Sequence, residues 1–240
     1  MKNSIFKCFG ITKTDVTSIL SDIFANSEGV LITLQEDGPV VTIKIDADES
    51  NNRILDKTAE IFQRLNNYIY AEEDISVYEA VFRLLKLNNL TLATAESITA
   101  GNVAANFVKF NSGASQILLE GNVVYTNKAK IRMLDVPESV LEKHTAVSVE
   151  TAYDMAKGCL NKSGADIVIA TTGYAGGDNN PDNGLVYIAI GDKKKIDVYK
   201  NIFEGNREEV IEIATMAAFF YLIKKLRKND FFLEKNIDIR

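Results

Sequence analysis

The sequence of 240 residues contains no tryptophan, one histidine and two cysteines. The single histidine, His144, is the one residue on which a Ser-His-Asp triad could be built. Cys8 and Cys159 lie far apart in the sequence, which excludes a CxxC redox pair and a cysteine-rich metal site. No second histidine accompanies His144, so we expect it to be structural or surface-exposed rather than a metal ligand.

The sequence also lacks an apolar run close to the roughly twenty residues that span a bilayer. Its start, MKNSIFKCFGITKTD, shows neither the apolar core nor the cleavage site of a signal peptide. These absences predict a soluble, cytoplasmic protein with reduced thiols and no membrane partner. The net charge of −6 argues against non-specific binding of nucleic acid. The negative charge is concentrated in residues 1–75, with about seven Lys/Arg against about thirteen Asp/Glu.

The patterning of apolar residues predicts two domains, residues 1–72 and residues 73–240. The first reads as a small α+β domain of order β-α-β-β-α, with elements over 4–11, 12–26, 29–35, 40–46 and 50–65. The polar segment NNYIYAEEDIS is the expected junction. In the second domain helices and strands alternate, which predicts a three-layer α/β/α fold with a mixed sheet.

The elements expected in the second domain place its chemistry-bearing residues at the ends of strands. We expect helices over 76–87, 99–110, 127–134, 149–162 and 207–227, and strands over 91–94, 121–125, 166–171, 185–191 and 195–203. Pro137 is expected to open a further short helix, and Ser148 to cap the helix that follows.

Ser97 lies where an apolar strand gives way to a helix. A serine in this position is most often a helix N-cap. However, Thr99 is better placed as the cap, which would leave Ser97 free to point outward. A helix N-terminus concentrates N–H donors that can hold a phosphate or an oxyanion. The neighbouring Ala100 and Gly101 leave room for a ligand near the backbone.

Tyr125 and Lys130 lie at the next strand-to-helix junction. Lys130 is expected in the first turn of its helix, where the helix dipole disfavours a cation. Partial burial there would lower its pKa, and a neutral amine could take the proton of Ser97. Lys128 competes for this role but faces elsewhere on the helix.

A glycine-rich loop, TTGYAGGDNNPDNG, follows the buried strand over 166–171. Loops in this position of α/β domains commonly bind ligands, although many are only turns. It is not a phosphate-binding P-loop, because no GK[ST] follows. Thr172 and Gly173 could offer a hydroxyl and an N–H group to a phosphate or an amide oxygen.

Five motifs occur in a fixed order: AES-x-T-x-G, VVYTN-x-AK, AVS-x-ET, TG-x-AG and GLVYIAI. In order and spacing they resemble the C-terminal domain family of the competence/damage-inducible protein CinA, which includes the stand-alone nicotinamide-nucleotide amidases. The resemblance covers about residues 76–228. Residues 1–72 resemble the KH-like domain that precedes the amidase domain in full-length CinA proteins.

The resemblance implies a cytoplasmic enzyme of pyridine-nucleotide salvage, without metal or cofactor, that hydrolyses the carboxamide of nicotinamide mononucleotide to nicotinate mononucleotide and ammonia. It implies Ser97 as the nucleophile, Lys130 as the base and Tyr125 as an aid to proton transfer. It implies a homodimer, and a substrate-binding set of Thr99, Gly101, Thr172, Gly173 and Arg207.

The chain departs from the family pattern AESCTGG at Ile98 and Ala100, and from GITGIAGP at Tyr174 and neighbouring positions. The methyl group of Ala100 and the bulk of Tyr174 are expected to change the substrate or weaken the activity. One alternative is therefore a nucleotide-binding or interaction module that has lost hydrolysis. RNA binding by residues 1–72 is a weaker alternative, because a KH domain clamps RNA with a GXXG loop and residues 1–75 contain none.

Overall fold

The structure is a computed structural model that describes residues 2–176 and 181–228. The chain divides into two compact units, Met1–Ala80 and Val81–Arg240. The division falls within helix α4 (Val77–Leu87), whereas the sequence pattern placed a boundary at residue 72.

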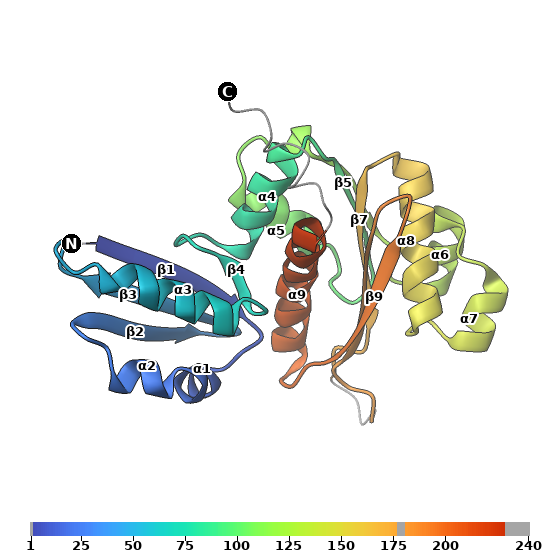
Figure 1. The fold of residues 1–240 in the computed structure, drawn as a ribbon. Coiled ribbons are helices and arrows are strands. Elements are labelled where there is room, and N and C mark those ends of the chain that lie inside the picture. Colours follow the sequence, from blue (N-terminus) through green and yellow to red (C-terminus); the bar gives the residue numbers. More distant parts are fainter. Residues whose placement is uncertain (1, 177–180, 229–240) are drawn as a thin grey trace. The chain divides into compact units, whose positions relative to one another are not determined.

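The first unit is a four-stranded antiparallel sheet in the order β2-β3-β1-β4 (Figure 1). Its strands are β1 (Lys2–Phe9), β2 (Val30–Asp37), β3 (Val40–Ala47) and β4 (Ile69–Ala71). Its helices are α1 (Lys13–Ile19), α2 (Ser21–Ala25) and α3 (Arg53–Leu65). Alternate residues of the strands, such as Phe6 and Cys8, face a core shared with the helices.

Two expectations for this unit were wrong. The helix expected over 12–26 is broken at Leu20, whose backbone (φ −103°, ψ 15°) leaves the helical region while its side chain is fully buried in the core. The expected junction contains β4, which pairs with β1 and whose three residues are all buried. A strand of this length is too short to show an alternating pattern.

The second unit is built on a five-stranded mixed sheet in the order β6-β5-β7-β8-β9. Its strands are β5 (Leu92–Glu96), β6 (Leu118–Val123), β7 (Ile167–Gly173), β8 (Leu185–Gly191) and β9 (Ile196–Ile202). Strand β5 pairs in parallel with β6 and β7, whereas β8 and β9 are antiparallel to their neighbours. The mixed sheet predicted from the sequence is confirmed.

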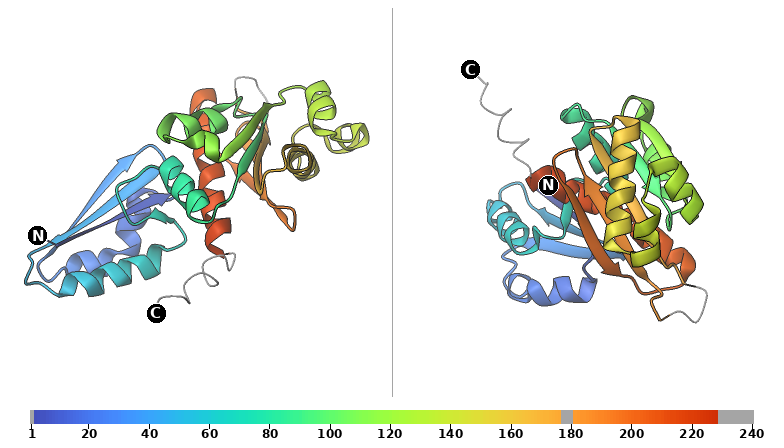
Figure 2. Two further views of the ribbon diagram at one scale, coloured as in Figure 1. Left: turned by 90° about the horizontal axis from the view of Figure 1, so that it is seen from above. Right: turned by 90° about the vertical axis from the view of Figure 1, so that its right-hand side faces the viewer.

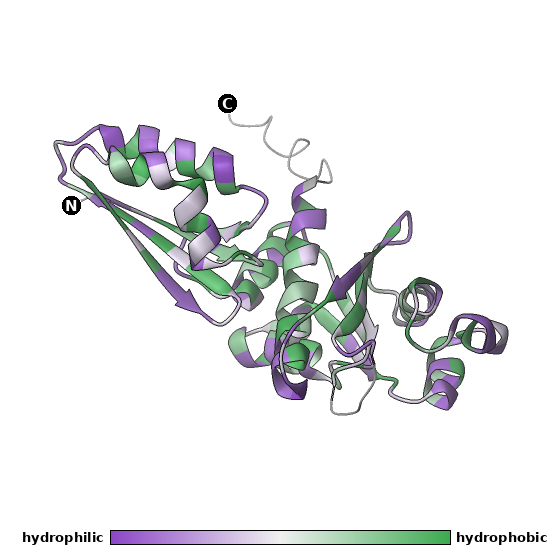
Figure 3. Ribbon diagram, turned by 90° about the horizontal axis from the view of Figure 1, so that it is seen from below, coloured by the Kyte–Doolittle hydropathy of each residue, from purple (hydrophilic) through white to green (hydrophobic). Residues whose placement is uncertain are grey.

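Helices cover both faces of this sheet and complete the predicted three layers (Figure 2). They are α5 (Asn102–Phe110), the 3₁₀ turn η1 (Ala114–Gln116), α6 (Asn127–Leu134), α7 (Glu138–His144), α8 (Val149–Ser163) and α9 (Arg207–Lys228). α8 packs on one face and α9 on the other. In Figure 3 the central strands are coloured as hydrophobic and the outward faces of the surrounding helices as hydrophilic.

The topology brings three strand ends to one edge of the sheet. Because β5, β6 and β7 run in parallel, the residues that follow their carboxyl ends lie close together. These residues begin at Ser97, Val124 and Tyr174. Such an edge is where open α/β sheets bind ligands. Among the described residues, the helices are all too short or too polar to cross a bilayer.

Candidate active site

The chain brings Ser97 and Lys130 into direct contact at this edge. The Nζ atom of Lys130 lies 3.0 Å from Oγ of Ser97. The same nitrogen donates to the carbonyl oxygens of Val124 at 2.9 Å and Tyr125 at 3.4 Å. The N–H group of Ser97 donates to the carbonyl oxygen of Thr171 on β7 at 2.9 Å. The side chain of Lys130 and the backbone of Ser97 are therefore both held by the backbone of neighbouring strand ends.

Lys130 is buried in a setting that disfavours its charge. The residue is only 1% exposed, and its partners in the described chain are neutral oxygen atoms. Burial lowers the pKa of its amine to about 8. About a tenth of the amine is therefore neutral at pH 7, far more than for an ordinary lysine, and the neutral amine can accept the Ser97 proton across the observed contact. Lys128 is exposed to solvent, so it does not compete for this role.

The turn between β5 and α5 is organised by Glu96, a residue that was not predicted to belong to the site. Thr99 was expected to cap α5, but the N-cap is Gly101, with φ +99° and no side chain to offer. The buried carboxylate of Glu96 caps the helix instead. It accepts the N–H groups of Gly101, Val103 and Ala104, each at 2.9 Å. Ser97 is 7% exposed and does not point outward as expected.

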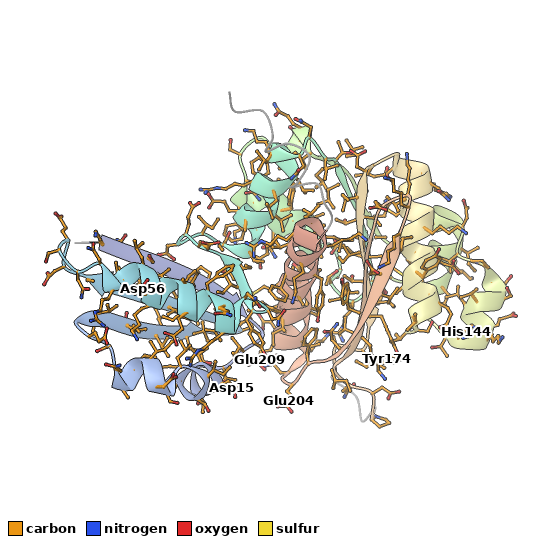
Figure 4. The ribbon with its side chains drawn as sticks, viewed as in Figure 1. Asp15, Asp56, His144, Tyr174, Glu204 and Glu209 are labelled. Atoms are coloured by element: carbon orange, nitrogen blue, oxygen red, sulfur yellow. The ribbon has the colours of Figure 1, made fainter. Side chains whose placement is uncertain are left out.

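A pocket of about 190 Å³ adjoins the serine–lysine pair. It is lined by Ile98, Tyr125, Gly173, Tyr174, Ala175, Gly176, Asn183 and Arg207. Ile98 follows Ser97 in the chain, and the carbonyl of Tyr125 accepts a hydrogen bond from Lys130. The pocket is smaller than the ~300–1,000 Å³ typical of sites for drug-sized ligands, so it matches one ring of a nucleotide better than the whole molecule. Tyr174 lies just beyond the end of β7 (Figure 4).

Tyr125 and Arg207 meet across this pocket. The Tyr125 side chain is 59% exposed, and its hydroxyl accepts a hydrogen bond from Nη2 of Arg207 at 3.3 Å. Nη1 of Arg207 donates to the carbonyl of Gly176 at 3.1 Å. Within the described chain no carboxylate pairs with Arg207, so its positive charge is available to an anion. The hydroxyl of Tyr125 contacts Arg207 rather than Ser97 or Lys130.

The other residues expected to bind substrate lie in different places. Gly173 lines the pocket, and a Cβ atom there would come within 2.6 Å of a carbonyl oxygen of β8. Thr172 is 1% exposed and its hydroxyl donates to the carbonyl of Ala146 at 2.7 Å, which ties β7 to the loop before α8. Thr99 is fully buried beside Glu96, and Gly101 does not line the pocket.

The glycine-rich loop contributes to the pocket, as its position after a buried strand predicted. Its composition did not predict which of its residues line the pocket. Ala175, Gly176 and Asn183 line the pocket, whereas residues 177–180 lie outside the described part of the chain. The position of Glu96 in the sequence could have predicted its capping role. A carboxylate between a buried strand and a helix start can accept hydrogen bonds from the first N–H groups of that helix.

Ala100 adopts a left-handed conformation, with φ +52°, and is exposed outside the pocket. Its methyl group is therefore a source of backbone strain, not an obstacle to a ligand.

We expect Ala100→Gly to stabilise the protein by about 0.5–1 kcal/mol without changing activity. Ala105→Gly, on the exposed face of α5, is the matched control and should destabilise by about 1 kcal/mol. Urea unfolding checks both; a destabilised Ala100→Gly would contradict the expectation.

His144 lies on α7 (Figure 4). It ends its helix and forms a 3.3 Å contact with Glu150 in the first turn of α8. In the described residues, no group of three or more His, Cys, Asp and Glu side chains is arranged to hold a metal ion. Cys8 and Cys159 are both buried, and burial raises the pKa of each thiol to about 12.

The second unit is thus an α/β domain that carries a serine–lysine pair at the carboxyl ends of its parallel strands. The CinA C-terminal domain family model matches residues 74–226. The chain therefore belongs to the CinA family.

Solved structures and curated relatives agree with this assignment. A CinA superfamily protein from Klebsiella pneumoniae is 33% identical with a TM-score of 0.61, over 63% of this chain and 96% of that protein. A competence/damage-inducible protein from Agrobacterium tumefaciens is 30% identical with a TM-score of 0.59, over 65% of this chain and 100% of that protein. CinA-like proteins of Geotalea uraniireducens and Citrifermentans bemidjiense are 32% and 35% identical over 94% and 92% of this chain. The chain spans only 56% and 54% of their lengths.

Proposed function

We propose that this chain is a serine amidase that hydrolyses the carboxamide of nicotinamide mononucleotide to nicotinate mononucleotide and ammonia. The observation that carries the proposal is the 3.0 Å contact between Ser97 Oγ and the buried Nζ of Lys130, whose pKa burial lowers to about 8. A serine becomes a nucleophile when a neutral base lies within hydrogen-bond reach. The choice of nicotinamide mononucleotide rests on the family resemblance.

The proposed reaction has two halves. Neutral Lys130 takes the proton of Ser97, and Oγ attacks the carboxamide carbon to form a tetrahedral intermediate. Lys130 then returns the proton to the nitrogen, the C–N bond breaks and ammonia leaves an ester on Ser97. Water attacks this ester with Lys130 again as the base, which releases the carboxylate and restores Ser97.

The pocket is proposed to hold the pyridine ring of the substrate. Its size suits the pyridine ring. Arg207 lies at the pocket wall without a carboxylate partner in the described chain, so we assign it to the 5′-phosphate. Tyr174 adds bulk to the wall and so restricts what can enter.

The test of the function is release of ammonia from nicotinamide mononucleotide by the purified chain in the presence of a chelator. We expect ammonia and nicotinate mononucleotide to appear in equal amounts, because the proposed steps use only protein groups and water. Tight binding of nicotinamide mononucleotide by folded protein without ammonia release would overturn the proposal. That outcome would favour the alternative of a binding module.

Arg207→Gln tests the phosphate assignment. We expect KM for nicotinamide mononucleotide to rise about 10- to 100-fold with little change in kcat, since a charge-assisted hydrogen bond contributes about 1.5–3 kcal/mol. Nicotinamide riboside, which lacks the phosphate, is the matched control substrate and should be hydrolysed equally by both proteins. Equal losses on both substrates would contradict a role in phosphate binding.

A further inference from the structure

The backbone N–H groups around Ser97 are almost all paired. The N–H groups of Ser97, Ala100, Gly101, Asn102, Val103 and Ala104 each have an acceptor. Within the described chain, the N–H groups of Ile98 and Thr99 have none. These two residues are 4% and 0% exposed. Unpaired N–H groups in buried residues are rare. Ile98 directly follows the nucleophile and lines the pocket, so a ligand oxygen can be the missing acceptor of its N–H group, whereas Thr99 is fully buried and is not among the residues that line the pocket.

Glu96 holds the turn in which these two residues lie. Its carboxylate is fully buried and accepts five hydrogen bonds, all from neutral donors. The donors are the hydroxyls of Thr94 and Thr99 and the N–H groups of Gly101, Val103 and Ala104. These contacts bind the far side of the turn and the start of α5 to the end of β5. The carboxylate engages Thr99 through its hydroxyl and makes no hydrogen bond to the N–H groups of Ile98 and Thr99.

The same residue also connects the nucleophile to the base. The backbone carbonyl of Glu96 accepts the N–H group of Val124 at 2.8 Å. The carbonyl of Val124 in turn accepts the Nζ of Lys130 at 2.9 Å. A shift of Glu96 would therefore move the turn that carries Ser97 and the strand end that anchors Lys130.

We propose that the N–H group of Ile98 is an oxyanion-hole donor for Ser97, and that Glu96 is the positioning residue that holds the turn carrying this N–H group beside the reacting carbonyl. This inference rests on the proposed role of Ser97 as the nucleophile. In the tetrahedral intermediate the former carbonyl oxygen carries a negative charge. A fixed donor stabilises this charge more than it stabilises the neutral carbonyl of the substrate, so it accelerates acylation without tightening substrate binding.

The direct test removes one N–H group and nothing else. Ile98 is replaced by its α-hydroxy acid, which changes the backbone amide to an ester. The probe is a fluorophosphonate: Ser97 Oγ bonds to phosphorus, the P–F bond breaks, Lys130 takes the proton and fluoride leaves. We expect phosphonylation of Ser97 to slow about 10²–10³-fold, the usual loss for one oxyanion donor. The matched control is the same change at Asn102, whose N–H pairs with the carbonyl of Thr99 at 2.9 Å, and it should label at the wild-type rate.

The probe separates failure of this inference from failure of the proposed function. Fast labelling of Ser97 in both the wild type and the Ile98 ester would overturn the oxyanion hole and leave the nucleophile in place. Absence of labelling at Ser97 in the wild type would overturn both. Neither outcome depends on whether nicotinamide mononucleotide is the substrate.

Glu96→Gln tests the positioning role. The amide keeps the shape of the side chain but presents an NH₂ group to N–H donors, so the turn must rearrange. We expect kcat for nicotinamide mononucleotide to fall about 10²-fold with KM nearly unchanged, because the loss falls on the transition state. Thr94→Val removes one donor to the same carboxylate on the β5 side and should change kcat little. A Glu96→Gln protein with a lower melting temperature but an unchanged kcat would show that Glu96 is purely structural, and would overturn its positioning role.

Discussion

Replacing Lys130 with methionine is expected to reduce kcat for nicotinamide mononucleotide about 10³–10⁴-fold and to stabilise the protein at neutral pH. The loss of activity follows from the loss of the general base 3.0 Å from Ser97 Oγ. The gain in stability follows from burial, since the residue is 1% exposed and no carboxylate in the described chain compensates its charge. The same property that fits Lys130 for catalysis thus costs folding free energy.

The sign of the pH dependence follows from the lowered pKa. Below pH 8 the amine is protonated in both the folded and the unfolded chain, and the folded chain bears the full cost of the buried charge. Between about 8 and the ordinary value of 10.5 only the unfolded chain keeps the proton, so stability rises with pH. A shift of this size corresponds to about 3 kcal/mol, offset in the variant by the lost hydrogen bonds. We therefore expect the melting temperature of Lys130→Met to exceed that of the wild type by more at pH 7 than at pH 10.

Thermal unfolding of both proteins at several pH values measures this difference. Lys128→Met is the matched control: it removes an exposed lysine of the same helix and should change neither kcat nor the pH dependence of stability. A constant difference in melting temperature between pH 7 and pH 10 would contradict a buried amine of lowered pKa. Wild-type kcat/KM should likewise rise with pH and level off above about 8.

Ser97→Ala is expected to lower kcat for nicotinamide mononucleotide at least ~10³-fold, because no acyl-enzyme can form without Oγ. The fold should be retained, since the N–H group of Ser97 still donates to Thr171. Ammonia release and circular dichroism measure the two effects.

Ser148→Ala is the matched control, because Ser148, like Ser97, is a buried serine on the N-terminal side of a helix. Its side chain caps α8 through the N–H group of Thr151 at 3.1 Å. The control should lose about 1 kcal/mol of stability and keep its activity. Substantial turnover by Ser97→Ala would remove Ser97 from the mechanism.

The sequence predicted the second unit better than the first. The helix expected over 127–134 matches α6, and Ser148 caps α8 as predicted, because capping residues and apolar spacing act locally. The break at Leu20 and the short strand β4 were missed. Both depend on tertiary burial, since Leu20 packs into the core and β4 is stabilised by pairing with β1.

In the candidate site, too, the features that depend on tertiary contacts could not be predicted from the sequence. Ser97 and Lys130 could be proposed from residue type and position, and the structure brings them together. Thr99 and Thr172 offered hydroxyls in the right motifs, but hydrogen bonds to Glu96 and Ala146 occupy those hydroxyls in the interior. Whether a hydroxyl faces substrate or a structural partner depends on contacts between residues far apart in the sequence. For the same reason, spacing along the chain did not reveal the meeting of Tyr125 and Arg207 across the pocket.

The most direct test of the account is mass spectrometry of the protein quenched in acid during turnover of nicotinamide mononucleotide, followed by digestion to locate any adduct. We predict a nicotinate mononucleotide ester on the peptide that contains Ser97, formed with the first ammonia released and lost as nicotinate mononucleotide appears. Complete hydrolysis of the substrate while every quenched sample holds unmodified Ser97, or an adduct on another residue, would contradict acyl transfer by the Ser97–Lys130 pair.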